Sequence, residues 1–456
     1  MAHRRAGSAW PVLNAVTREL DRIARSAPSL EPVRMGRIVT CDGGLIEVSG
    51  LNAPIGTLCR AEAPSGEPVP AAEVVGFRGG RSLMMLLGDT VRLQPGALVR
   101  AEGHPGVAKV GEEYLGRAVD GQGLPIDGGP PVKARHDWLL GGRREGALER
   151  ASVIEPFDCG IRAINALATM GVGQRLGVIA GSGVGKSVLL DTMVSGADCD
   201  VAVVALIGER AREVSDFVYR HMRGERKRRT VIVAVPSDHA ANLRLRGAQL
   251  ATSLAEYFRS QGKRVLLVMD SLTRVAHAAR EIALSLGEAG AARGYPPSAL
   301  ATITKLIERA GNSASSGGSV TGLYSVLADG DDTSDPVVDT ARAILDGHIV
   351  LSRDIAQRGH YPAIDIPSSL SRVMADVAEP AHRLHAGELR GLIAAHEANR
   401  DFLMMGAYQQ GTDPQLDRAL AMQEQIRTFL SQEAGKPVSL GASTAALAAL
   451  MGDAAG

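Results

Sequence analysis

Five apolar runs alternate with segments of helical period across residues 151–375. These runs are Arg175–Ala180, Val201–Ile207, Thr230–Val235, Val265–Met269 and Leu323–Ala328. Apolar runs of this length, separated by helical segments, indicate strands that are buried on both faces of a mainly parallel sheet. Ligands of such sheets bind at the carboxyl ends of the strands. The pattern therefore predicts an α/β domain with its functional site along one edge of the sheet.

Different patterns flank this domain. Residues 33–105 form short β-rich segments separated by glycine-containing turns, which predict a small antiparallel barrel or sandwich. Residues 106–150 are dense in turn residues and are expected to connect the two domains. Residues 376–456 show no strand pattern. Helical spacing from Leu384 to His396 and an Asp413 N-cap followed by Pro414, which opens a helix through Leu430, predict a small helical domain.

An amphipathic helix is predicted near the N-terminus, between Pro11 and Arg25, because its apolar positions recur at three- and four-residue spacing. The segment Ser26–Pro32 is typical of a linker, so residues 1–32 lie outside any obvious domain. Two interpretations of the apolar side stay open: it packs on its own chain, or it docks onto a partner helix or a lipid surface.

Composition narrows the classes of partner. The 456 residues hold 50 Lys and Arg against 50 Asp and Glu, and 3% are aromatic. Zero net charge and few aromatic side chains argue against a nucleic-acid partner. Four widely spaced cysteines without a CxxC pair are typical of reduced thiols. There is no signal-peptide pattern and no apolar run near the ~18 residues that span a bilayer, so we expect a cytoplasmic protein, at most peripheral to a membrane.

Candidate chemistry begins at the sequence VIAGSGVGKSVLL, residues 178–190, where an apolar strand enters a glycine-rich turn. The glycines allow backbone N–H groups to converge on phosphate oxygens. Lys186 would neutralise the β- and γ-phosphates of a nucleotide, and the Ser187 hydroxyl would ligate Mg²⁺. Ala180 stands where the usual pattern has its first glycine. The predicted nucleotide-binding residues of this loop are Gly181, Ser182, Gly183, Val184, Gly185, Lys186, Ser187 and Val188.

Two other strand ends carry carboxylates. Asp270 ends the run VLLVMD and would hold Mg²⁺ through water, although an aspartate at a strand end is more often a turn or cap residue. Glu209 follows Gly208 after another strand and precedes Arg210. Glu209 either polarises a water that attacks the γ-phosphate or is an acidic residue favoured at a helix N-terminus.

Two later features are weaker on their own. In the string GHYPAIDIPSSLSR, Tyr361 could stack on an adenine and Arg372 could stabilise developing charge, but a Tyr-Pro pair is more often loop packing and a lone arginine is more often solvated or ion-paired. The basic run Arg220–Arg229 is predicted to be a solvated helix face rather than a nucleic-acid surface.

Several long strings together resemble the flagellum-specific export ATPases, which are related to the catalytic subunits of rotary ATP synthases. They include GQRLGVIAGSGVGKSVLL, LIGERAREVSDF, LLVMDSLTRVAHAAREIAL, GYPPS and GHYPAIDIPSSLSRV, and the resemblance covers roughly residues 35 to 432. It implies an N-terminal β-barrel, a central RecA-like P-loop domain and a C-terminal helical domain, with ATP and Mg²⁺ as ligands. The family also carries alanine at the position of Ala180.

The resemblance assigns roles by motif. Lys186 and Ser187 are implied to be the phosphate lysine and the Mg²⁺ ligand, and Asp270 the strand-end carboxylate that holds the metal. Glu209 is similar to the catalytic glutamate. The remaining implied roles are Arg210 near the γ-phosphate, Tyr361 in the adenine pocket and Arg372 as an arginine finger that reaches the neighbouring subunit's site.

The resemblance also implies function and partners. Such a protein hydrolyses ATP in a homohexameric ring to drive unfolding and export of flagellar subunits. Its N-terminal helix contacts a stator-like regulatory export protein and acidic lipid, and its other partners are the export gate, chaperones and cargo. The implied location is the cytoplasm, at the inner face of the cytoplasmic membrane.

Four alternative functions share this core. The first is an injectisome ATPase and the second is a rotary synthase catalytic subunit. A non-catalytic ring subunit would lack the carboxylate of Glu209. An RNA translocase would need an aromatic barrel, whereas Phe77 is the single aromatic residue between positions 35 and 105.

Overall fold

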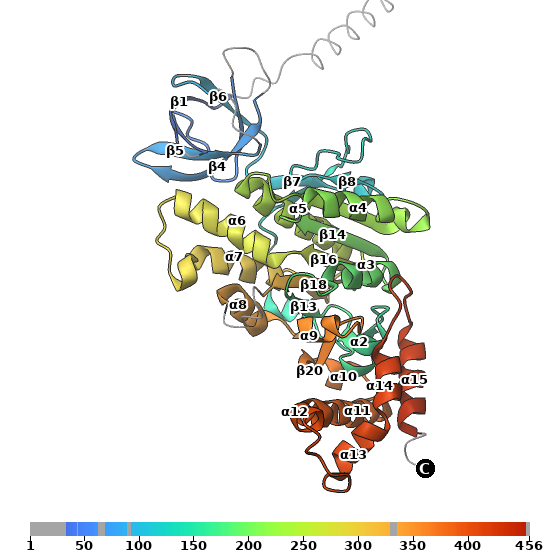
Figure 1. The fold of residues 1–456 in the computed structure, drawn as a ribbon. Coiled ribbons are helices and arrows are strands. Elements are labelled where there is room, and N and C mark those ends of the chain that lie inside the picture. Colours follow the sequence, from blue (N-terminus) through green and yellow to red (C-terminus); the bar gives the residue numbers. More distant parts are fainter. Residues whose placement is uncertain are drawn as a thin grey trace, which may run out of the picture.

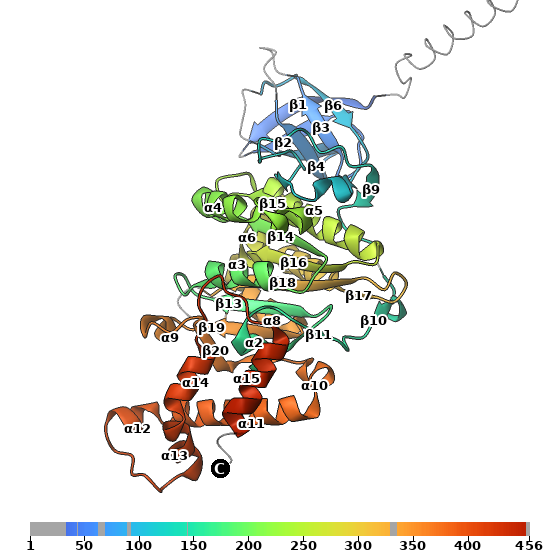
Figure 2. The ribbon, with the colours of Figure 1, turned by 90° about the vertical axis from the view of Figure 1, so that its right-hand side faces the viewer.

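Three parts follow one another along the length of the molecule in the computed structural model. It describes residues 33–452 apart from 43, 63–68, 89–92, 144 and 329–334. A β-barrel lies at one end, a layered α/β domain in the middle and a group of helices at the other end (Figures 1 and 2). The predicted fold class is therefore confirmed. The helix predicted between Pro11 and Arg25 lies outside the described residues.

The N-terminal part is a closed antiparallel barrel, which decides between the two architectures left open by the sequence. Its strands run in the order β1-β2-β5-β4-β3-β6. Buried and less buried side chains alternate along β2 and the first half of β4, and Ile46, Val48, Val74 and Val99 fill the interior. Closure leaves no open sheet edge. The bounds are β1 Met35–Asp42, β2 Leu45–Ser49, β3 Leu58–Ala61, β4 Ala71–Arg78, β5 Arg81–Leu86 and β6 Leu98–Glu102.

The segment predicted as a connector contributes to the central sheet. Strands β7 (Val107–Val110) and β9 (His136–Leu139) pair with each other, with the short helix η1 (Glu112–Tyr114) between them. Strand β8 (Ala118–Val119) pairs in parallel with β15 and extends the sheet by one strand. A strand of two residues is too short to give a hydrophobic pattern, which is why the sequence did not indicate it.

The central sheet has the strand order β20-β19-β13-β18-β16-β14-β15-β8, and neighbours along this path are parallel except β19 and β20. Its strands are β13 (Arg175–Ala180), β14 (Val201–Ile207), β15 (Thr230–Val235), β16 (Arg264–Asp270), β18 (Ser319–Leu327), β19 (Gly347–Leu351) and β20 (Ile364–Ser371). Three predicted strands match in both bounds. Strand β18 starts earlier than predicted. The apolar pattern did not include its first residues because Ser319 and Thr321 are polar, although both are buried. A short antiparallel extension, β10 (Arg150–Ala151) and β17 (Gly311–Ser313), joins at β18.

Helices cover both faces of this sheet. Successive side chains of a strand point to opposite faces, so Val204 packs in one apolar cluster and Val203 in the other. The first face carries α2 (Arg162–Leu167), α3 (Lys186–Gly196) and α4 (Ala211–His221). The second carries α5 (Ala241–Ser260), α6 (Leu272–Ser285), α7 (Pro297–Glu308) and α8 (Pro336–Ile344).

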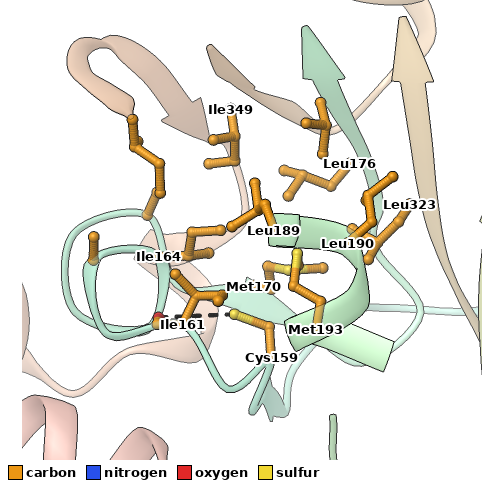
Figure 3. Close-up of a cluster of buried hydrophobic side chains, with 14 of the residues drawn as sticks. Cys159, Ile161, Ile164, Met170, Leu176, Leu189, Leu190, Met193, Leu323 and Ile349 are labelled. Carbon is orange, nitrogen blue, oxygen red and sulfur yellow. Dashed lines mark hydrogen bonds between the residues drawn. The ribbon is translucent and has the colours of Figure 1, made fainter. Parts of the chain in front are cut away.

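Helix α3 is fixed to the sheet through its apolar side. Leu189, Leu190 and Met193 lie in the same buried cluster as Leu176 of β13, Leu323 of β18 and Ile349 of β19 (Figure 3). Each of these side chains is at most 3% exposed. Close packing of this kind fixes the position of the helix on the strands, and with it the position of Lys186 at the first turn.

The C-terminal part is helical, as predicted. Asp413 Oδ1 accepts hydrogen bonds from the backbone N–H groups of Gln415 and Leu416, which confirms the predicted cap. The predicted helix through Leu430 is interrupted at Met422. The helices after β20 are α10 (Met374–Val377), α11 (Pro380–Ala398), α12 (Arg400–Met404), α13 (Pro414–Ala421), α14 (Gln423–Leu430) and α15 (Leu440–Gly452), whereas α9 (Arg353–Gln357) lies between β19 and β20. Within the described ranges, every helix is too short or too polar to cross a bilayer.

We predict that Glu256→Ala destabilises the protein strongly. Glu256 is 3% exposed, and its two carboxylate oxygens accept hydrogen bonds from Arg309 Nε at 2.7 Å and Nη2 at 2.8 Å. Trp138 Nε1 also donates to Glu256 at 2.9 Å. Removing the carboxylate leaves a buried, uncompensated guanidinium, so the free energy of unfolding should fall by about 3–5 kcal/mol in denaturant titration.

The matched control is Asp137→Ala. Asp137 forms an ion pair with Lys109 across β7 and β9, and both side chains are more than half exposed. Solvent screens such a pair, so this variant should keep the wild-type denaturation midpoint. Equal midpoints for Glu256→Ala and Asp137→Ala would contradict the assigned role of the buried pair.

Candidate nucleotide-binding site

The glycine-rich loop connects the carboxyl end of β13 to the first turn of α3. Gly183 and Gly185 have φ angles of +79° and +89°, in the left-handed region that L side chains rarely adopt. A β-carbon on Gly183 would meet no atom within 4 Å, so the loop faces open space. Ala180 is 1% exposed and belongs to the apolar cluster beneath α3. Its methyl group therefore packs in the core, away from the loop, which explains how alanine fits this position.

Lys186 lies between two carboxylates at neighbouring strand ends. Asp270 is the last residue of β16, and its pairing partner Leu206 precedes the turn that carries Glu209. Lys186 Nζ forms an ion pair with Asp270 and lies 3.4 Å from Glu209 Oε1. The Ser325 hydroxyl of β18 donates a hydrogen bond to Asp270. The parallel pairing of β14, β16 and β18 thus brings these groups to one edge of the sheet.

The charges in this cluster shift one another's pKa values. Burial lowers the pKa of the Lys186 ammonium, but the negative charges of Asp270 and Glu209 outweigh burial and raise it above the usual value. Burial raises the pKa of Glu209, and the charge of Asp270 raises it further against the opposing effect of Lys186. The lysine therefore stays charged, and the Glu209 carboxylate is a stronger base than an exposed glutamate.

A cleft of about 1050 Å³ brings most of the predicted site residues together. The residues from Gly181 to Val188 except Val184, together with Glu209, Arg210 and Asp270, belong to its wall. Val184 is 1% exposed and lies in the apolar cluster beneath the loop, so the structure does not place its side chain in the cleft. Ser187 is exposed there at the start of α3. Its hydroxyl and the Asp270 carboxylate offer oxygen atoms of the kind that Mg²⁺ prefers.

Tyr361 lies in a second pocket that adjoins the cleft. This pocket has a volume of about 410 Å³, and Gly185, Val188 and Ala434 contribute to both spaces. A β-carbon on Gly185 would lie 3.5 Å from the Tyr361 ring. A flat apolar group bound beside the loop would therefore contact the face or edge of this ring.

Arg372 does not lie in its own chain's cleft. It directly follows β20, whose last residue, Ser371, pairs with Gly347 at the start of β19. The Arg372 N–H donates to the Asp346 carbonyl oxygen at 2.9 Å, and the Asp346 carboxylate accepts from the N–H of Arg175, the first residue of β13. Arg372 is thus at the amino end of β13, whereas the glycine-rich loop is at its carboxyl end.

Three features of the site were missed by sequence reasoning. Arg274 of α6 belongs to the wall of the cleft, and its buried Nε has no hydrogen-bond partner among the described residues. Ser325 holds Asp270; a polar residue inside an apolar run was the available signal. The segment Gln432–Gly435 borders both pockets, and the Gln432 N–H donates to the Tyr361 carbonyl oxygen at 3.0 Å. No local pattern indicates that segment, because folding brings it there.

A glycine-rich loop between a parallel strand and a helix, with a lysine held by carboxylates at neighbouring strand ends, defines a P-loop nucleotide-binding protein. Residues 160–371 match the ATP synthase alpha/beta family, nucleotide-binding domain, and residues 378–449 match the T3SS EscN ATPase C-terminal domain. A flagellum-specific ATP synthase of Pseudomonas aeruginosa is 47% identical over 424 residues, which cover 92% of this chain and 94% of that protein.

Two solved structures are similar in fold. The assembled ATPase EscN from the enteropathogenic E. coli type III secretion system gives a TM-score of 0.85, and EscN in complex with its central stalk EscO gives 0.83. Each is 37% identical and covers 91% of this chain and 99% of that chain. The chain belongs to the family of flagellum-specific ATP synthases, within the wider ATP synthase alpha/beta family, and the resemblance seen in the sequence is confirmed.

We predict that Gly208→Ala reduces ATP hydrolysis. Gly208 joins β14 to Glu209 with a φ of +72°, and an added β-carbon would lie 2.6 Å from the Arg274 β-carbon. The backbone must move to relieve this overlap, and Glu209 moves with it. Glu209 is a predicted catalytic residue, and displacement of a catalytic group by about 1 Å costs on the order of 100-fold in rate, so we expect steady-state kcat to fall by roughly that factor.

Gly224→Ala is the control for backbone strain alone. Gly224 has a similar φ of +65°, but a β-carbon there would meet no atom within 4 Å, and the residue lies beyond the end of α4. This variant should be destabilised while its kcat stays at the wild-type value. An equal loss of kcat in the two variants would argue against displacement of Glu209.

Proposed function

We propose that this chain is the ATPase of a flagellar type III protein export apparatus, which hydrolyses ATP to drive unfolding and export of flagellar subunits. The cluster of Lys186, Asp270 and Glu209 is the observation that carries the hydrolysis. A chain that only bound nucleotide would need the loop and the lysine, but not a glutamate of raised pKa 3.4 Å from the lysine ammonium.

Different residues of the cleft have different roles in the proposed reaction. Lys186 exchanges its carboxylate partners for phosphate oxygens when ATP enters, and the backbone N–H groups of Gly183 and Gly185 orient those oxygens. Glu209 then accepts the proton of the water that attacks the γ-phosphate. Arg210, exposed in the wall of the same cleft, stabilises charge on the γ-phosphate.

The metal ion is proposed to be Mg²⁺, held by Ser187 directly and by Asp270 through water. Among the described residues no group of three or more His, Cys, Asp or Glu side chains could hold a metal alone. Phosphate oxygens and water must therefore complete the coordination, which is the usual way in which proteins bind Mg²⁺. A bound ion would neutralise part of the negative charge of the phosphates.

Tyr361 is proposed to line the adenine site. The pocket beside the loop contains Val188, Leu189 and Pro362 as well as the tyrosine ring, and aromatic and apolar groups of this kind bind the faces of a purine. The base would then lie next to the loop that holds the phosphates.

Arg372 is proposed to act on the site of a neighbouring subunit in a homohexameric ring. Its position at the opposite edge of the sheet from its own P-loop supports this role, as does the similarity to EscN, which was solved as an assembled ATPase. By analogy with EscN and its central stalk EscO, we propose a stalk partner. The remaining proposed partners are a stator-like regulatory protein at the N-terminal helix, the export gate, chaperones and cargo, at the cytoplasmic face of the membrane and without nucleic acid.

A flagellar assignment is favoured over an injectisome because identity to the flagellar relative of Pseudomonas aeruginosa is 47%, against 41% to a type 3 secretion system ATPase of Xanthomonas euvesicatoria. Complementation distinguishes the two: the chain should restore motility to a strain that lacks its flagellar ATPase. Restoration of effector secretion in an injectisome mutant, without motility in the flagellar mutant, would favour the second assignment.

We predict that Lys186→Ala and Glu209→Gln each abolish steady-state ATP hydrolysis for different reasons. The first variant loses the phosphate ligand, so ATP affinity measured by fluorescence titration should also fall. The second keeps the shape of the side chain but cannot accept a proton, so it should bind ATP with wild-type affinity. Wild-type turnover in either variant would refute the proposed mechanism.

A mixing experiment tests the action of Arg372 in a neighbouring site. Arg372→Ala and Lys186→Ala are each expected to be inactive alone. In a random mixture, about a quarter of the interfaces in a ring join a subunit with intact Lys186 to a neighbour with intact Arg372. The mixture should therefore recover about a quarter of the wild-type rate. No recovery, or an active Arg372→Ala protein, would show that Arg372 does not act between subunits.

A further inference from the structure

Two helices carry the two halves of the proposed catalytic machinery. Helix α3 begins with Lys186 and Ser187, and α4 begins immediately after Glu209 and Arg210. The 3.4 Å separation between Lys186 Nζ and Glu209 Oε1 therefore depends on how α4 is placed beside α3. Both helices lie on the same face of the sheet.

A buried histidine connects these helices close to the cleft. His221, at the end of α4, is 2% exposed, and its Nε2 lies 2.5 Å from Asp191 Oδ1 of α3. Two acceptors would repel each other at this distance, so Nε2 carries a hydrogen and donates it. Arg220 Nε also donates to Asp191 Oδ1, at 3.3 Å. Asp191 lies in the wall of the cleft, four residues and about one helical turn after Ser187.

The electrostatics of Asp191 support a fixed contact. Burial raises the pKa of Asp191, but the hydrogen bond and charge of His221 and the charge of Arg220 outweigh burial and lower it below the usual value. The His221 ring stacks on Phe217 with 4.2 Å between centroids. Its Nδ1 is buried without a hydrogen-bond partner among the described residues, so Asp191 is the polar group that orients the ring.

A second set of contacts holds the far end of α3. The basic run was predicted to be a solvated helix face, and no residue of η3 (Glu225–Arg229) is buried. Two of its side chains nevertheless bind α3: Arg226 Nη1 donates to Ser195 Oγ at 2.9 Å, and Arg229 Nη1 donates to the carbonyl oxygens of Ala197 and Cys199. These contacts lie at the opposite end of α3 from Lys186.

We propose that the Asp191–His221 contact is a positioning device that sets the place of α4, and hence of Glu209, relative to the phosphate-binding lysine. The buried side chains of α4 are Val214, Phe217 and His221. Apolar packing holds α4 on the sheet, and a hydrogen bond adds a preferred length and angle to that packing. His221 is the polar member of this set, so its bond to Asp191 fixes how far α4 can slide along α3.

This proposal rests on the proposed hydrolysis, and four variants test it. His221→Phe keeps an aromatic ring against Phe217 but removes the bond to Asp191. His221→Gln places an amide N–H near the position of Nε2 and restores a donor. Asp191→Ala removes the acceptor from the cleft side without a change in the buried ring. Arg229→Ala is the matched control, because it removes a contact between η3 and the far end of α3.

The kinetic readout separates positioning from a general loss of structure. His221→Phe and Asp191→Ala should lower kcat roughly 10- to 100-fold, with KM for ATP within about twofold of wild type, because the P-loop itself is unchanged. His221→Gln should recover most of the lost kcat. Arg229→Ala should lower the melting temperature and keep wild-type kcat.

Hydrogen exchange tests the same contact without nucleotide or turnover. Amides in the first turn of α4, residues 211–215, should exchange faster in His221→Phe and Asp191→Ala than in the wild type and Arg229→Ala. An inactive wild type with this exchange pattern would overturn the proposed hydrolysis and leave the contact in place. The positioning role is overturned by wild-type kcat in Asp191→Ala, by an equal loss of kcat in Arg229→Ala, or by no recovery in His221→Gln.

Discussion

The ion pairs of the buried Lys186 ammonium depend on the rest of the sheet and define the site. A charge removed from water requires compensation close by. Asp270 and Glu209 provide it only because β14 and β16 pair in parallel with Leu206 opposite Asp270, and Ser325 holds Asp270 only because β18 lies on the other side. A phosphate chain offers the same negative charge as the carboxylates. The contacts that stabilise the lysine without nucleotide are therefore the ones that prepare it to bind nucleotide.

The central strands could be predicted from the sequence where apolar residues and glycine fill every position after the first. Strands β13, β14 and β15 have the predicted bounds for this reason. The apolar pattern failed to predict strand residues with buried polar side chains, such as Ser319 and Thr321 of β18. The Thr321 hydroxyl accepts a hydrogen bond from the Gly173 N–H, and this contact exists only in the folded sheet. The pattern also failed at β8, because two residues are too few to show a hydrophobic period. Local apolar patterning thus predicts the strands but not the contributions that depend on tertiary pairing.

The residues of the site also divide into those that the sequence indicated and those that depend on tertiary packing. Lys186 and Ser187 belong to one contiguous loop, and Asp270 and Glu209 each end an apolar strand, so strand order alone brings them together. Arg274 and the segment Gln432–Gly435 come from a helix on the other face of the sheet and from the C-terminal part. Their presence in the walls of the two pockets follows from packing between segments that are distant in the sequence. Such packing cannot be predicted from the local pattern of a single sequence.

The sheet also explains why catalysis and assembly are linked in this family of folds. Strand β13 has six residues, which span about 20 Å. The P-loop lies at one end of it and Arg372 at the other. Because β13 is paired on both sides, with β18 and β19, no hinge within the chain can bring these ends together. With the role proposed for Arg372, each chain presents its P-loop and its arginine on opposite edges of one sheet, and closed rotational symmetry is the arrangement in which each P-loop would meet a neighbour's arginine.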